Sequence, residues 1–110
     1  MPELTPNQFE TFLLIYAAHV DYNYSECEKE YILAHTTRED YDAMHHLFHS
    51  VSEYQGLKVI LDCRKKYFQS KEEQHLMQDK IVQLFKADGV YSRAEKVFLS
   101  FLNRMIAEEV

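Results

Sequence analysis

The chain has 110 residues, of which 46% are apolar, and it contains only two glycines and two prolines. This length provides one domain with a single core, and the scarcity of breakers favours helices over strands. The formal charge of −6 argues against a protein that binds nucleic-acid phosphates, because such binding relies on clustered lysines and arginines.

Helix-start signals open the chain. The segment Thr5–Gln8 combines an N-cap threonine, a proline in the first turn and a capping-box glutamine, so a first helix should begin here and run to about Val20. Its apolar face is expected to comprise Phe9, Phe12, Leu13, Tyr16, Ala17 and Val20. Ser25 and Glu28 form a second capping box, which predicts a short second helix.

Four more helices are expected further along the chain. Their start signals are Thr36–Glu39, Ser52-x-x-Gln55, Ser70-x-x-Glu73 and Ser92-x-x-Glu95. The inward positions of the last two helices are Met77, Ile81, Leu84 and Phe85, and Ala94, Phe98, Phe101, Leu102, Met105 and Ile106. Burying a large apolar side chain contributes roughly 1.5–3 kcal/mol. We therefore expect residues 1–110 to form one all-α domain, a compact bundle of about six helices.

A ten-residue motif occurs twice, at residues 20–29 and 87–96. Its identical positions are Asp21 and Asp88, Tyr24 and Tyr91, Ser25 and Ser92, Glu28 and Glu95, and Lys29 and Lys96. Every pair is separated by 67 residues, as from Asp21 to Asp88. The repeat predicts that the first and last helix pairs are related helix–turn–helix units.

Helix capping accounts for the serines and glutamates of both motifs. Asp21 and Asp88 need another explanation, because each falls near a helix C-terminus, where the macrodipole disfavours a carboxylate. Each aspartate either forms a local Asx turn or helps to hold a hard cation such as Ca²⁺ or Mg²⁺. The periodicity and spacing of the residues alone favour the Asx turn over the cation site. An EF-hand is excluded, since the positions that need glycine hold Glu26 and Arg93.

The pattern Asp-Gly-x-x-Ser-x-x-Glu at residues 88–95, preceded by alanine and entering a helix, resembles the tellurite-resistance TerB-like domain family over essentially the whole chain. The resemblance implies two motifs that approach each other and form an acidic, metal-binding surface. It also implies a non-enzymatic role in stress-response assemblies whose partners are often membrane-associated. The implied metal site is Asp21, Glu28, Asp88 and Glu95, with Ca²⁺, Mg²⁺ or Zn²⁺ as the cation. The first copy departs from the pattern, because Tyr22 stands where the second has Gly89.

The predicted third helix carries a second candidate group. Asp42, His45, His46 and His49 share one face, and His45 with His49 has the i, i+4 spacing of a zinc pair. The glutamate of HExxH is absent, so a solvated face is the favoured interpretation. Catalysis has little support: the chain has neither a GxSxG sequence nor a glycine-rich phosphate loop, and Ala94 replaces Cys27 in the second motif.

Two hypotheses follow. The first is a cytoplasmic, non-enzymatic helical module that holds a divalent cation or a basic partner at the acidic site. The second is a scaffolding domain whose motifs are only helix caps and whose Tyr22, Tyr54 and Tyr91 contact another protein. A cytoplasmic location is expected because residues 1–5 lack a basic leader and the two cysteines form no disulfide framework. No apolar run reaches the length that spans a bilayer, so direct membrane insertion is not expected.

Overall fold

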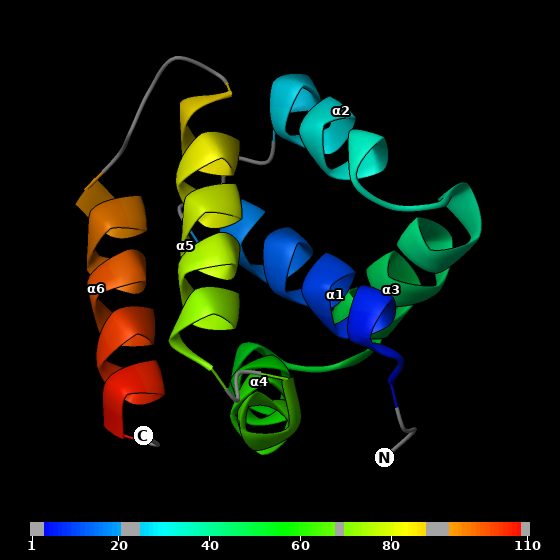
Figure 1. Cartoon of the computed structure of the whole chain (residues 1–110). Helices are drawn as coiled ribbons and strands as arrows, with labels where there is room; N and C mark the ends of the chain where they lie inside the picture. The colour runs from blue at the N-terminus through cyan, green and yellow to red at the C-terminus, as the bar shows by residue number, and fades with distance from the viewer. Residues whose placement is uncertain (1–3, 21–24, 68–69, 88–92, 109–110) are drawn as a thin grey trace.

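The structure is a computed structural model that describes residues 4–20, 25–67, 70–87 and 93–108, without the side chains of residues 64–67 and 105–108. The described chain forms six helices and no strand (Figure 1). They are α1 (Pro6–Ala18), α2 (Glu26–Ala34), α3 (Arg38–Ser50), α4 (Glu53–Tyr67), α5 (Lys71–Lys86) and α6 (Arg93–Glu108). The predicted all-α bundle of six helices is confirmed.

Capping residues set the helix starts. The Thr5 hydroxyl accepts a hydrogen bond from the Gln8 amide at 3.1 Å, and the Gln8 side chain accepts one from the Thr5 amide at 3.0 Å. The other helices that begin at a described hydroxyl cap follow Ser25, Thr37, Ser52 and Ser70. Ser92, the cap expected for α6, lies outside the described residues. The start signals in the sequence therefore located these helices correctly.

The C-terminus of α1 differs from the expectation, because the helix ends at Ala18 rather than at about Val20. His19 is the C-cap, and its amide donates to the Tyr16 carbonyl at 3.1 Å. Its ring Nδ1 lies 2.7 Å from the Ile15 carbonyl. The side chain of His19 thus satisfies a carbonyl of the last turn that the helix itself leaves without an amide.

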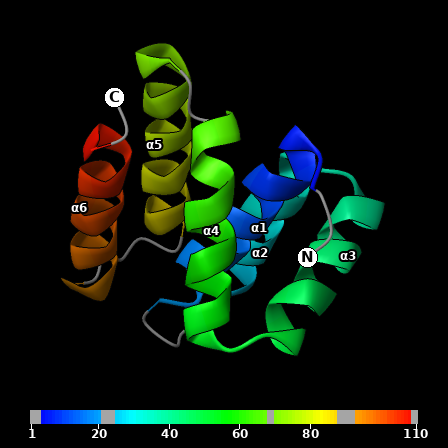
Figure 2. The ribbon, with the colours of Figure 1, turned by 90° about the horizontal axis from the view of Figure 1, so that it is seen from below.

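Helix α1 lies at the centre of the bundle and packs against α2, α3, α4 and α5 (Figures 1 and 2). Its buried side chains are Phe9, Thr11, Phe12, Leu13, Leu14, Ile15, Ala17 and Ala18. The predicted single apolar face was therefore too narrow. A helix with neighbours on most of its sides buries Leu14, Ile15 and Ala18 as well.

Helix α6 lies at the edge of the bundle, against α5 (Figures 1 and 2). Phe98 and Leu102 are buried, as predicted. Ala94 and Phe101 were also expected to point inward, and this is wrong, because both are exposed. With α5 as its main neighbour, α6 has room for only a narrow buried stripe.

Gly56 allows close packing between α4 and α1. A Cβ atom at this position would lie 3.1 Å from Cε2 of Tyr16, tighter than ordinary van der Waals contact. Glycine near the start of α4 therefore lets the α4 backbone rest on the Tyr16 ring. This contact fixes one wall of the hollow described below.

Candidate functional site

Two of the four predicted metal ligands fall within the described chain. Glu28 and Glu95 lie in the first turns of α2 and α6, and each side chain is only 1% exposed. Asp21 and Asp88 lie outside the described residues. Equal burial of the two glutamates agrees with the predicted relation between the helix pairs.

Glu28 forms a complete capping box with Ser25. Its Oε1 accepts hydrogen bonds from the Ser25 amide at 3.1 Å and from the Ser25 hydroxyl at 3.3 Å. The Ser25 hydroxyl in turn accepts from the Glu28 amide at 3.1 Å. A buried carboxylate is costly unless it is hydrogen-bonded, and a position near a helix N-terminus favours its charge. The capping role predicted for this pair is confirmed.

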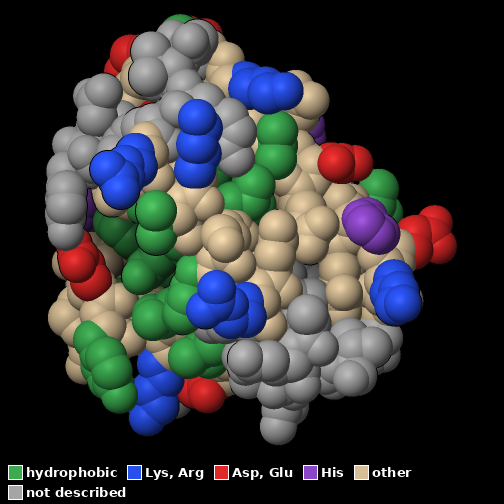
Figure 3. Space-filling view, turned by 90° about the vertical axis from the view of Figure 1, so that its left-hand side faces the viewer, with side chains coloured by type: hydrophobic (Ala, Val, Ile, Leu, Met, Phe, Trp, Pro, Cys, Tyr) green, Lys and Arg blue, Asp and Glu red, His purple; other side chains and the backbone are tan. Residues whose placement is uncertain are grey.

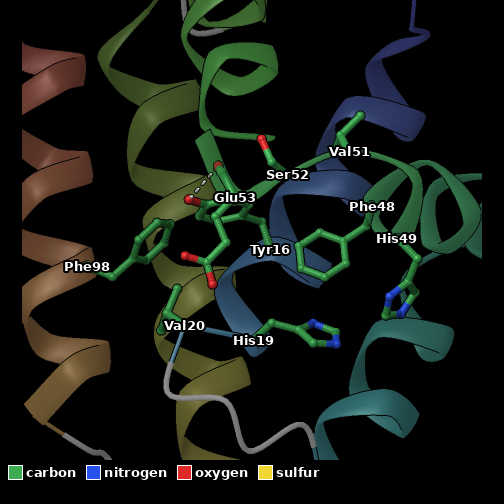
Figure 4. Close-up of a pocket in the computed structure, with 9 residues that line it drawn as sticks. All are labelled: Tyr16, His19, Val20, Phe48, His49, Val51, Ser52, Glu53 and Phe98. Carbon is green, nitrogen blue, oxygen red and sulfur yellow. Dashed lines mark hydrogen bonds between the residues drawn. The ribbon is translucent and has the colours of Figure 1, made fainter. Parts of the chain in front are cut away.

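Described residues of the two motifs line one hollow. Val20, directly before the first aspartate, lines one open hollow with Arg93, Ala94 and Phe98, which follow the second motif's serine. Figure 4 shows Val20 of the α1 end beside Phe98 of α6. Val20 of the first motif and Arg93 and Ala94 of the second therefore line the same hollow.

A second hollow, of about 480 Å³, opens between α1, the α3–α4 connection and α6 (Figure 4). Its aromatic walls are Tyr16, Phe48 and Phe98, with Tyr16 and Phe98 ring centroids 5.7 Å apart. The Tyr16 hydroxyl donates to the Glu53 carbonyl at 3.4 Å. Sequence reasoning placed these aromatics in the core stripes and missed the hollow, because its walls come from three separate segments.

Three histidines gather beside this hollow. His45 and His49 of α3 have their Nε2 atoms 3.2 Å apart, and the ring centroids of His49 and His19 are 5.9 Å apart. His19 is the C-cap of α1, and its ring contacts that of Phe48, with centroids 4.5 Å apart and the ring planes tilted by 36°. The i, i+4 pair is therefore formed as the spacing indicated. The proximity of His19 depends on how α1 crosses α3, which no local pattern contains.

The pKa of His45 is lowered from its ordinary value of 6.5. Partial burial is the main cause, and the charges that His49, His19 and Lys29 can carry act in the same direction. Asp42 opposes them. The ring of His45 therefore stays neutral, with a lone pair available, to lower pH than an isolated histidine.

Across the described ranges, no three His, Cys, Asp or Glu side chains converge in a way that could hold a metal ion. Nor is any helix in those ranges both long and apolar enough to cross a bilayer. No protein-family model, curated protein or solved structure matches this chain. Functional inference therefore depends on the residues and their geometry.

Proposed function

We propose that this chain is a non-enzymatic, cytoplasmic module of the tellurite-resistance TerB-like type, which holds a divalent cation at an acidic site built from its two motifs. The observation that carries the proposal is that described residues of both motifs line one hollow, Val20 from the first motif and Arg93 and Ala94 from the second. Because Asp21 and Asp88 each lie within a few residues of this contact in sequence, one ion can draw ligands from both motifs.

The chemistry of the motifs suits a hard cation. Each aspartate follows a helix end whose carbonyl groups carry partial negative charge, and carboxylate and carbonyl oxygens are the ligands of Ca²⁺ and Mg²⁺. The repulsion that an aspartate meets at this position is then offset by the ion. Glu28 and Glu95 belong to the same two motifs, and both are buried.

The proposal is tested by titrating the metal-free protein with Ca²⁺, Mg²⁺ and Zn²⁺ in a calorimeter and by thermal unfolding. A bound cation should raise the melting temperature, and the double variant Asp21→Ala, Asp88→Ala should abolish the rise that Ca²⁺ or Mg²⁺ produces. Asp62→Ala with Asp79→Ala is the matched control, because it removes the same charge from two exposed positions. Binding no tighter than millimolar for all three ions would refute the metal site.

A second candidate function is a scaffolding domain that binds another protein, with motifs that act only as helix caps. Two observations favour it. The Ser25–Glu28 box is complete without an ion. In addition, the outer face of α6 exposes Val97 at 61% and Phe101 at 41%.

Basic residues surround this apolar patch of α6. Arg93, Lys96 and Arg104 line a shallow hollow with Val97 and Phe101. Figure 3 shows hydrophobic side chains among lysines and arginines on this side of the molecule. Because Arg93, Lys96 and Arg104 lie beside the exposed apolar side chains, the patch would suit a partner that combines apolar and acidic side chains.

The scaffolding candidate predicts that Val97→Asp with Phe101→Asp abolishes self-association or partner binding while the helical content is retained. Light scattering of the wild type and the variant, each with and without metal, measures this directly. Two results together would argue against the α6 patch as a binding surface. The wild type would be monomeric, and the variant would capture the same partners as the wild type.

A further inference from the structure

His45 and His49 of α3 lie with their ring nitrogens close together. Their Nε2 atoms are 3.2 Å apart on a regular helix that begins at a capped residue, Thr37. Zinc–nitrogen bonds of about 2.0–2.1 Å at a tetrahedral angle place two ligand nitrogens about 3.3–3.4 Å apart. The separation of the two nitrogens therefore matches the one that a shared ion requires.

Neighbouring rings hold both histidines in this orientation. His45 stacks on Tyr41 with centroids 5.5 Å apart and an angle of 19°. His49 contacts Phe48, at 5.3 Å, and His19 with ring planes nearly perpendicular. Figure 4 shows the rings of His19 and His49 turned toward each other across the edge of the hollow. Such packing lowers the conformational entropy that ion binding must overcome.

Without an ion, the short separation is a hydrogen bond in which one Nε2 donates and the other accepts. An ion between them requires the donating ring to carry its proton on Nδ1 instead, a change of tautomer that leaves the charge unaltered. His19 illustrates that tautomer, because its Nδ1 lies 2.7 Å from the Ile15 carbonyl and so carries the proton.

We propose that His45 and His49 form a site for a transition-metal ion of the Zn²⁺, Ni²⁺ or Cu²⁺ class, completed by water. Imidazole nitrogens select these ions, whereas Ca²⁺ and Mg²⁺ prefer oxygen ligands. The site lies on α3 and uses no residue of the repeated motifs, so it does not depend on the function proposed above. The absence of a converging third side chain among the described residues is consistent with two protein ligands.

The test is a Zn²⁺ titration of the untagged, metal-free protein. Binding is measured by calorimetry and by NMR of the nitrogen resonances of the histidine rings. Zn²⁺ should move the Nε2 resonances of His45 and His49 together. His45→Gln and His49→Gln should each weaken Zn²⁺ binding at least about tenfold. His46→Gln is the matched control, since His46 is an exposed histidine of the same helix, and it should leave binding unchanged.

Three results would overturn the proposal. The first is wild-type binding no tighter than millimolar. The second is equal binding by wild type and His49→Gln. The third is a loss on His19→Gln as large as that on His49→Gln, which would require a three-residue site instead of a pair. Zn²⁺ binding that survives in Asp21→Ala, Asp88→Ala but not in His49→Gln separates this site from the acidic one.

Discussion

The Ser25–Glu28 capping box offers a quantitative test of the first motif, through the substitution Ser25→Ala. The change removes the acceptor for the Glu28 amide, and losing such an N-cap costs about 1 kcal/mol. It also removes the 3.3 Å hydrogen bond from the Ser25 hydroxyl to a carboxylate that is 1% exposed. A hydrogen bond to a buried charged group adds about 1–2 kcal/mol. The free energy of unfolding should therefore fall by about 2–3 kcal/mol.

Ser70→Ala is the matched control for this prediction. Ser70 caps α5 through the Glu73 amide at 3.1 Å, with the same geometry, but Glu73 is exposed. This substitution should cost only about 1 kcal/mol. Urea unfolding followed by circular dichroism measures both values, and 1 kcal/mol corresponds to about 4 °C in melting temperature for a chain of this size. Equal losses for the two variants would show that the buried carboxylate of Glu28 gains nothing from the Ser25 hydroxyl.

Two further predictions concern pH and the repeat. Because the pKa of His45 is lowered in the folded state, the unfolded chain binds the proton more tightly, so stability should be constant above about pH 6.5 and should fall as the pH drops below that value. The urea midpoint of unfolding, measured with a chelator present, should fall less between pH 7.5 and pH 5.5 for His45→Gln than for wild type. An equal fall in the two proteins would show that His45 does not cause the loss of stability. Leu14→Ala and Ile81→Ala, at matching repeat positions exposed by 1% and 0%, should each cost about 2–5 kcal/mol in the same assay. A cost below 1 kcal/mol at either position would mean that the cores of the two helix pairs are not equivalent.

The sequence predicted helix starts better than it predicted helix faces. A start depends on neighbouring residues, as in Thr5 with Gln8, and so it is visible locally. The burial of Leu14 and Ile15 depends instead on how many helices surround α1, which follows from the tertiary arrangement. The exposure of Phe101 has the opposite cause, because α6 lies at the edge of the bundle.

The candidate sites also combine features that local sequence indicates with features that depend on the tertiary arrangement. The i, i+4 spacing of His45 and His49 indicated a pair, and the structure places their Nε2 atoms within 3.2 Å. The approach of His19 from α1 could not be read from spacing, since it depends on the contact between α1 and α3. The repeat paired Glu28 with Glu95, and the resemblance placed both in an acidic surface, whereas the structure buries both of them. The positions of Asp21 and Asp88 remain a prediction.

The most direct test of the central proposal is a crystal soaked with a lanthanide ion as a substitute for calcium. The proposed acidic site predicts an anomalous peak between the two motifs, within bonding distance of the carboxylates of Asp21 and Asp88. If each carboxylate accepted hydrogen bonds only from the amides that follow it, with no ion between the motifs, the result would contradict a shared metal site and leave helix capping as the role of the repeat.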